Sequence, residues 1–288
     1  MPWVLRGLRN GIVTTRYPRR PDGYGPNFRG AVTVLARSED VGERGGIAGD
    51  GTRKDANEDE LAALCPTGAI AMVTGAAGDS VVQVDRGRCI LCGRCVDVRP
   101  DLFGFSPVVE TAAVGRSALV VPSTGEDDAA LERLRDELRR RTRALRRSIH
   151  VRHVDAGSDG SEEWEVAALL NPVYDVHRLG IFFTASPRHA DLLLVTGAGT
   201  AGMAGPLRRT FEAMPDPKVV VATGVDAVSG GLVHPTYATS SGVGGLVPVD
   251  VWVPGSPPSP FGILHGILLG IGLLPATGRA HSSAGAGR

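Results

Sequence analysis

Four cysteines are the residues of this chain whose types and spacing could support metal chemistry. Cys89, Cys92 and Cys95 form a C-x2-C-x2-C run, and Cys65 lies upstream in a Cys-Pro dipeptide. The close run allows one tight loop to direct three thiolates into a small volume, while the distant cysteine can close the site. Thiolates are soft ligands that suit iron–sulfur clusters and zinc. The spacing therefore predicts one metal site that uses all four cysteines.

An iron–sulfur cluster fits this pattern better than zinc does. A bacterial-type ferredoxin holds each cluster with three closely spaced cysteines and a Cys-Pro cysteine from its other motif. Cys65, Cys89, Cys92 and Cys95 complete such a set for one [4Fe-4S] cluster. Zinc is the main alternative, although structural zinc usually takes paired C-x2-C knuckles from separate loops. Core cysteines without any metal are the second alternative.

The cysteine motifs resemble those of the two-cluster ferredoxin subunits of respiratory complex I and of membrane-bound, energy-converting [NiFe] hydrogenases. The resemblance extends upstream to residues 14–18 and 28–30, which look like the arm before the first cysteine motif of that family. Residues 38–64 then contain no cysteine, and Arg99-Pro100 stands where the family has the partner Cys-Pro. The resemblance implies that one cluster is lost completely and that its neighbour is retained.

Short apolar runs alternate with helical patterns beyond residue 147. Continuous Val and Leu runs separated by helices are typical of a largely parallel sheet that is covered on both faces. Strands are predicted at residues 148–154, 192–196, 219–223 and 249–253, and helices at residues 163–170, 205–213 and 260–274.

This second region resembles the cluster-bearing small subunit of complex I and of the energy-converting hydrogenases over nearly its whole length. Residues 149–157, 187–191, 214–218 and 247–255 carry most of the resemblance. In the hydrogenase members four cysteines hold a cluster, and the positions that match them here are Asp159, Glu162, Asp226 and Ser256. None of the four is a cysteine, so the resemblance implies a second vacated cluster site.

Two interpretations of these vacated positions remain open. Three carboxylates and one hydroxyl are hard oxygen ligands, which favour Mg²⁺ or Ca²⁺ over an iron–sulfur cluster. Crowded carboxylates would otherwise raise one another's pKa values. The favoured interpretation is a former cluster pocket that polar side chains and water have filled.

A glycine motif offers a different function. Residues 197–202 match G-x-G-x-x-G, follow a predicted strand and open a predicted helix, with Asp226 placed to contact a ribose. Glycine accounts for 39 residues of the chain, so chance matches are expected. The resembled family has an ordinary loop here, and nucleotide binding is the less favoured interpretation.

Composition excludes several other classes of protein. Thirty-one Lys and Arg balance 31 Asp and Glu, which argues against a nucleic-acid partner. The apolar run at residues 261–274 is shorter than the roughly 20 residues that cross a bilayer, and residues 1–20 lack the apolar core of a signal peptide. We expect a cytoplasmic protein that reaches the inner face of the cell membrane only through partners.

A basic helix is predicted at residues 126–149, with acids at its start and arginines towards its end. A solvated face or a subunit contact is favoured over contact with phosphate or a membrane surface.

We predict five segments in order: an extended arm (1–37), an α+β ferredoxin-like domain with one [4Fe-4S] cluster (38–108), a linker with this helix (109–148), an α/β domain with a mainly parallel, flavodoxin-like sheet (149–275) and a flexible tail (276–288).

The resemblance implies a component of an oxidoreductase complex, not a catalyst that acts alone. Such a subunit would transfer electrons through one [4Fe-4S] cluster and bind a large subunit and other electron-transfer subunits. A structural or redox-sensing paralogue without electron throughput is the alternative, and a nucleotide-binding enzyme is less favoured.

Overall fold

The computed structural model describes residues 3–20, 28–35, 58–74, 80–123, 128–143, 145, 148–233 and 235–274. Most of the cysteine-free segment that replaces the first motif, at residues 38–57, lies outside the described residues. So does the predicted tail at residues 276–288.

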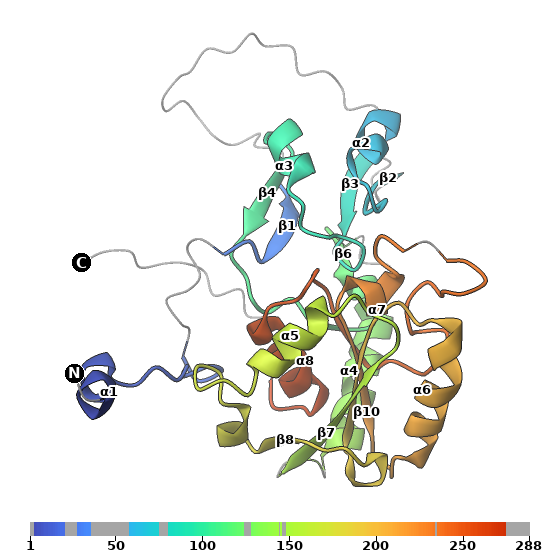
Figure 1. Cartoon of the computed structure of the whole chain (residues 1–288). Coiled ribbons are helices and arrows are strands. Elements are labelled where there is room, and N and C mark those ends of the chain that lie inside the picture. The colour runs from blue at the N-terminus through green and yellow to red at the C-terminus, as the bar shows by residue number, and fades with distance from the viewer. Residues whose placement is uncertain are drawn as a thin grey trace.

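A six-stranded, mostly parallel sheet forms the centre of the C-terminal part (Figure 1). Its order is β5-β11-β10-β9-β7-β8, so the five parallel strands follow the doubly wound order 2-1-3-4-5. This sheet confirms the predicted α/β fold of the region. The parallel strands are β7 (Ile149–Asp155), β8 (Ile181–Phe183), β9 (Leu192–Thr196), β10 (Val219–Thr223) and β11 (Val251–Val253), and β5 (Ala113–Val114) runs antiparallel at one edge.

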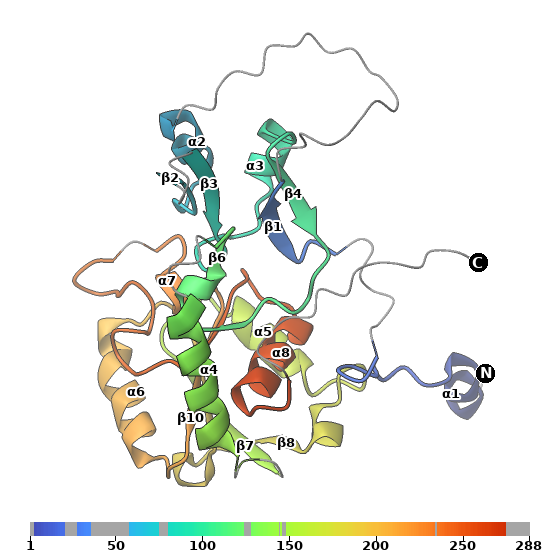
Figure 2. The same cartoon turned by 180° about the vertical axis from the view of Figure 1, so that it is seen from behind.

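Helices cover both faces of this sheet, which is why its strands are apolar on both sides (Figures 1 and 2). In β9, Leu192 and Leu194 join one core, and Leu193 and Val195 join the other. The first core also takes side chains from α5 (Ser161–Ala168) and α8 (Pro260–Gly270), and the second takes side chains from α6 (Ala201–Ala213) and α7 (Val225–Ser229).

Helix α8 accounts for the longest apolar run of the sequence. Every residue from Pro260 to Gly270 is buried within the protein. Within the described ranges, no helix has the length and apolar character needed to cross a membrane.

The cysteine-bearing part contains two small antiparallel sheets. Its elements repeat the order strand, helix, strand, and the inner strands pair with each other, as do the outer ones. The elements are β1 (Ala31–Val34), α2 (Glu58–Leu64) and β2 (Ile70–Thr74), followed by β3 (Ser80–Asp85), α3 (Arg94–Val98) and β4 (Phe103–Ser106). Because β1 lies within the predicted arm, the cysteine-bearing unit begins before residue 38.

The predicted linker joins the two parts through backbone pairing. Its strand β6 (Val120–Val121) pairs with β3, and β5 pairs with β11 of the large sheet. Arg116 lies between these strands and donates two hydrogen bonds to Asp85 at the end of β3, at 2.8 and 2.7 Å. Helix α4 (Asp128–Thr142) follows within the residues predicted as the basic helix.

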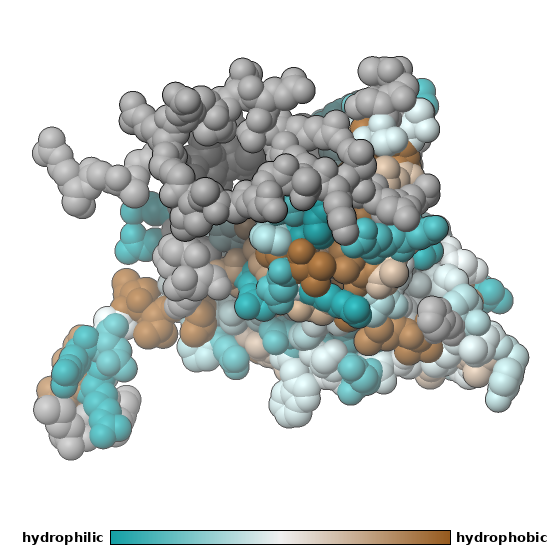
Figure 3. Space-filling view, turned by 90° about the horizontal axis from the view of Figure 1, so that it is seen from above, coloured by the Kyte–Doolittle hydropathy of each residue, from teal (hydrophilic) through white to brown (hydrophobic). Residues whose placement is uncertain are grey.

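The N-terminal arm begins with a helix that sequence periodicity missed. Helix α1 (Trp3–Asn10) stands apart from the body of the molecule, and hydrophobic side chains gather where the arm joins it (Figure 3). A helical pattern becomes distinct only over 11 to 18 residues, so a helix of about two turns escapes such a search.

Residues 14–17 of the arm lie along the C-terminal part of the same chain. The Thr15 N–H donates to the Val173 carbonyl at 2.7 Å, and Arg178 donates to the Tyr17 carbonyl at 2.6 Å. Tyr17 is only 5% exposed, and its ring meets Phe261 edge-on at 5.6 Å. Its hydroxyl donates to the Glu110 carboxylate at 3.2 Å, so the arm contacts both the linker and α8.

Replacing Tyr17 is expected to release the arm. Tyr17→Ala should lower the free energy of unfolding by about 3 kcal/mol, because a buried aromatic ring is removed. Tyr17→Phe should cost only about 1 kcal/mol, since it removes the hydrogen bond alone. Urea unfolding measures both values, and faster tryptic cleavage after Arg16 and Arg19 reports release of the arm. Tyr237→Ala is the control, because Tyr237 is 99% exposed; equal losses in both alanine variants would contradict anchoring by Tyr17.

Candidate metal centre

All four cysteines line one small cavity in the cysteine-bearing part. Cys65 directly follows α2, Cys89 and Cys92 lie in the loop after β3, and Cys95 lies in the first turn of α3. Cys65 and the cysteine run are far apart in the sequence, and the antiparallel pairing of β2 with β3 brings them together, because the start of β2 lies beside the end of β3. The other walls are mainly apolar: Val32, Leu64, Ala69, Ile70, Val84 and Ile90.

The loop that carries the cysteine run is tightly wound. Leu91 and Gly93 have positive φ angles of 56° and 81°. Glycine adopts this left-handed conformation freely, whereas a leucine adopts it at a cost of roughly 1–2 kcal/mol. The Leu91 side chain packs against the apolar core of this part, and such packing can offset the cost. The bent loop allows three closely spaced cysteines to line the same cavity.

The surroundings of two thiols favour the neutral form as long as no cation is bound. The Ala69 N–H donates to Cys65 Sγ at 3.2 Å, and the Thr67 hydroxyl lies 3.4 Å from the same sulfur. Burial raises the pKa of the Cys89 thiol to about 11, although a backbone N–H partly opposes this and the other cysteines add to it. Burial also raises the pKa of Cys95. Bound iron would supply the positive charge that stabilises the thiolates.

An ion pair occupies the position that the resemblance assigns to the second Cys-Pro. Arg99 follows α3 and stands where the resemblance places the second Cys-Pro. Its guanidinium donates to both carboxylate oxygens of Asp101, at 2.9 and 2.8 Å. The two side chains satisfy each other, so this position carries a local surface contact instead of a ligand.

The vacated positions of the C-terminal part lie near the carboxyl ends of its parallel strands. Asp159 follows β7, Glu162 lies in α5 and Asp226 lies in α7. The Val225 N–H donates to the Gly255 carbonyl at 2.8 Å, which brings the turn that contains Ser256 beside α7. The four positions assigned from the resemblance therefore lie in one region of the fold.

Glu162 is the buried member of this group. Glu162 is only 1% exposed. Its Oε1 occupies the space that a Cβ atom at position 224 would need, which the glycine there leaves free. Burial, together with Asp226 and Asp159, raises the pKa of Glu162 to about 7. Burial also raises the pKa of Asp226, whereas hydrogen bonds from Ser161 lower that of Asp159.

A hard-cation site gains no support from these side chains. Among the residues with a described placement, no three or more His, Cys, Asp or Glu are grouped so as to hold a single metal ion, and this applies to the four cysteines as well as to the carboxylates. A [4Fe-4S] cluster offers a separate iron to each thiolate, so its ligands need not converge on one ion. Two of the carboxylates instead use protein partners: Asp159 accepts two hydrogen bonds from Ser161, at 2.9 and 2.6 Å, and Glu162 accepts one from the Ser161 hydroxyl at 3.2 Å. This arrangement is compatible with a former pocket filled by polar side chains.

The glycine motif forms an ordinary connection between β9 and α6. The first N–H of α6, from Ala201, donates to the Ala238 carbonyl at 2.8 Å, and Thr200 forms a β-bridge with Thr239. A bound phosphate would need the free N–H groups of a helix N-terminus. Because another segment covers this end of α6, the structure does not favour nucleotide binding.

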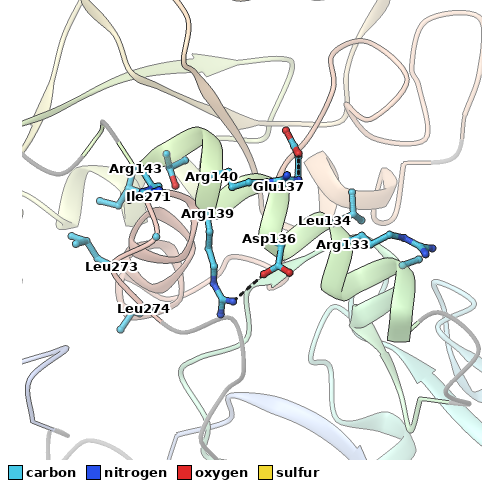
Figure 4. Close-up of a pocket in the computed structure, with 13 residues that line it drawn as sticks. Arg133, Leu134, Asp136, Glu137, Arg139, Arg140, Arg143, Ile271, Leu273 and Leu274 are labelled. Carbon is cyan, nitrogen blue, oxygen red and sulfur yellow. Dashed lines mark hydrogen bonds and ion pairs between the residues drawn. The ribbon is translucent and has the colours of Figure 1, made fainter.

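A groove lies away from the cysteines, between α4 and residues 271–274 (Figure 4). Two of its arginines pair with acids of the same helix: Arg139 with Asp136 at 3.3 Å, and Arg140 with Glu137 at 2.7 Å. Exposed pairs of this kind contribute little to stability. They agree with the favoured interpretation of the basic helix as a solvated face or a subunit contact.

Sequence analysis did not single out Arg86, which lies beside the cysteine cavity. Arg86 lines a second small cavity together with Cys89 and Leu91. The sequence feature that could have identified Arg86 is its position three residues before Cys89, the first cysteine of the run.

Two family models match the chain. Residues 82–140 match a 4Fe-4S single cluster domain, and residues 160–269 match the NADH ubiquinone oxidoreductase, 20 Kd subunit. The first range includes Cys89, Cys92 and Cys95 but not Cys65, and the second includes Glu162, Asp226 and Ser256. These matches define the class as an iron–sulfur protein with a C-terminal part like this small subunit.

Curated relatives narrow the class to a family. Formate hydrogenlyase subunit 7 of Escherichia coli is 43% identical over 130 residues, which is 45% of this chain and 51% of that protein. The probable membrane-bound hydrogenase subunit mbhJ of Pyrococcus furiosus is 39% identical over 140 residues, which is 49% of this chain and 84% of that protein. The chain therefore belongs to the family of these hydrogenase subunits and of the 20 kDa subunit of NADH ubiquinone oxidoreductase.

The extent of these matches differs between relatives. The chain spans about half the length of the Escherichia coli subunit that it matches. A chain in the solved structure of the membrane-bound sulfane sulfur reductase, an archaeal respiratory membrane complex, is 31% identical with a TM-score of 0.41, covering 48% of this chain and 76% of that chain.

Proposed function

We propose that this chain is an electron-transfer subunit of an oxidoreductase complex and that it carries a single [4Fe-4S] cluster. The observation that carries the proposal is that all four cysteines of the chain line one cavity. A cluster of this type offers a separate iron to each thiolate, so ligands placed around a cavity suit it. The family model for a single 4Fe-4S cluster supports the same assignment for three of the four cysteines.

Each part of the site has a role in this proposal. Cys65, Cys89, Cys92 and Cys95 would hold the cluster, which supplies one-electron oxidation and reduction when it is bound. The apolar walls exclude water, and the N–H of Ala69 stabilises negative charge on the Cys65 sulfur.

We also assign the cysteine-bearing part to the ferredoxin-like folds. The repeated order of strand, helix and strand supports this assignment, as does the pairing of β1 with β4 and of β2 with β3. Cys65-Pro66 after α2 and Arg99-Pro100 after α3 then occupy equivalent places in the two repeats. This equivalence supports the loss of one of two original clusters.

The C-terminal part would bind the large subunit of a hydrogenase-like or complex I-like assembly. Two relatives are named as subunits of hydrogenases or hydrogenlyases, which supports a place in a larger assembly. Two large aromatic side chains of the C-terminal part are exposed: Trp164 of α5, two residues from Glu162, is 80% exposed, and Tyr237 in the loop after α7 is 99% exposed. Such side chains often anchor protein interfaces. Membrane association would then come through partners.

Iron and sulfide quantification tests the proposed cluster. Protein purified without oxygen is expected to contain about four irons and four sulfides per chain and to give an EPR signal after reduction. Bound zinc, or iron for two clusters, would contradict the proposal. Rapid reoxidation of the reduced cluster by a soluble one-electron acceptor would support electron transfer.

A redox-sensing role is the second candidate function. The lack of thiols at Asp159, Glu162, Asp226 and Ser256 favours it, because an electron could not continue through a cluster at that place. A sensor would bind its partner with different affinities in its oxidised and reduced states. Partner binding measured in both redox states separates a sensor from a carrier, whose affinity would not depend on redox state.

A further inference from the structure

Arg86 is a partly buried cation that is held beside the proposed cluster. Its Nε donates to the Val32 carbonyl at 3.3 Å, and its backbone N–H donates to the Leu119 carbonyl at 2.9 Å. Arg86 lines one small cavity together with Cys89, Pro254 and Gly255. Arg86 and Cys89 therefore lie where the cysteine-bearing part meets the C-terminal part.

The neighbouring acid is already engaged by other arginines. Both carboxylate oxygens of Asp85 accept hydrogen bonds from Arg116, and Arg88 approaches the same carboxylate at 3.7 Å. Among the described residues, no carboxylate forms an ion pair with Arg86. Burial lowers the pKa of its guanidinium, and the favourable charge that opposes this effect is that of the Cys89 sulfur.

A partly buried cation without a counter-charge costs free energy, and this cost identifies a negatively charged group as the kind of group that should lie beside it. Four thiolates bound to a [4Fe-4S] core give a net negative charge, which grows by one when the cluster accepts an electron. A fixed positive charge close by stabilises the reduced state more than the oxidised state. Nearby charge and hydrogen bonding are among the means by which proteins set cluster potentials.

We infer that Arg86 is the counter-charge of the retained cluster and raises its reduction potential. This role rests on the proposed function, since it requires the cluster. Arg86 is a tuning residue that acts on the cluster through its electric field and does not bind iron. Arg86 shares one small cavity with Cys89 and with Pro254 and Gly255, so this charge lies next to the proposed cluster where the two parts of the chain meet.

Arg86→Gln in the full chain tests this role by redox titration followed by EPR. The variant removes the charge and keeps an N–H group that can reach the Val32 carbonyl. At the wild-type midpoint potential, the ratio of reduced to oxidised cluster is expected to fall about tenfold, which corresponds to a midpoint about 59 mV lower for one electron. The iron content should remain that of the wild type.

Arg88→Gln is the matched control. It removes the same charge from the same turn, but the Arg88 side chain is 54% exposed, so solvent and salt screen its charge. We expect this variant to change the ratio less than about twofold. Arg86→Lys keeps the charge and should stay closer to the wild-type potential than Arg86→Gln.

The possible results separate this role from the proposed function. Wild-type protein without iron would refute the cluster itself. A wild-type cluster with equal potentials in Arg86→Gln and wild type would overturn only the role of Arg86. If Arg86→Gln does not retain the cluster, Arg86→Lys decides: a retained cluster with a potential near that of the wild type supports the counter-charge, and loss in both variants overturns it.

Discussion

Cys65→Ser is expected to remove the [4Fe-4S] cluster, lowering the iron content from about four atoms per chain towards zero. Cys65 is the proposed ligand that lies outside both the cysteine run and the matched cluster domain. Burial raises the pKa of the Cys89 and Cys95 thiols, so these groups have little tendency to stay ionised without iron. Serine preserves the size of the side chain, which isolates the loss of the thiolate. Iron and sulfide analysis and EPR of anaerobically purified protein measure the result.

Thr67→Ala is the matched control for this variant. The Thr67 hydroxyl lies 3.4 Å from Cys65 Sγ. The Thr67→Ala substitution therefore changes the same loop but leaves all four thiols in place. The control should retain the full iron content. Retention of four irons by Cys65→Ser would show that the fourth ligand is another residue. A three-iron cluster would still identify Cys65 as a ligand, because only the iron that it holds would be lost.

Glu162→Gln is expected to stabilise the chain above pH 7 by on the order of 3 kcal/mol. Burial, with Asp226 and Asp159, raises the pKa of Glu162 in the folded chain from 4.5 to about 7. The folded state therefore holds this proton more tightly than the unfolded state does. The resulting stability is fully present below pH 4.5, declines as the pH rises towards 7 and is absent above it. Glutamine stays neutral and avoids this loss.

Urea unfolding at pH 5 and pH 8 checks the direction of this change in stability. Trp252, which packs against the core that contains Leu193 and Val195, is the fluorescent reporter. The difference between Glu162→Gln and wild type should be small at pH 5 and large at pH 8. Glu212→Gln removes a carboxylate from the exposed side of α6 and controls for a general effect of charge. Equal stabilisation at both pH values would contradict an effect of ionisation and would point to better packing of the amide.

Local sequence patterns predicted the helices and strands in which side-chain burial follows one regular pattern over several residues. The Leu192–Thr196 and Val219–Thr223 strands match their predicted ranges, because strands covered on both faces are continuously apolar. Strand β8 was missed, since three residues are too few to form a pattern. The pairing of β5 and β6 with sheets of different parts was also missed, because two-residue strands are specified by their partners.

The sequence by itself predicted the chemistry of the site and all four of its cysteines, but its spacing restricts the positions of only three thiols. Cys89, Cys92 and Cys95 are close in the chain, so their spacing limits where their thiols can lie. Only the tertiary structure decided that Cys65 lines the same cavity, that Arg86 lacks an acidic partner among the described residues, and that Glu162 is buried beside Gly224. These three properties depend on contacts between segments far apart in the chain, and such contacts form only when the core packs.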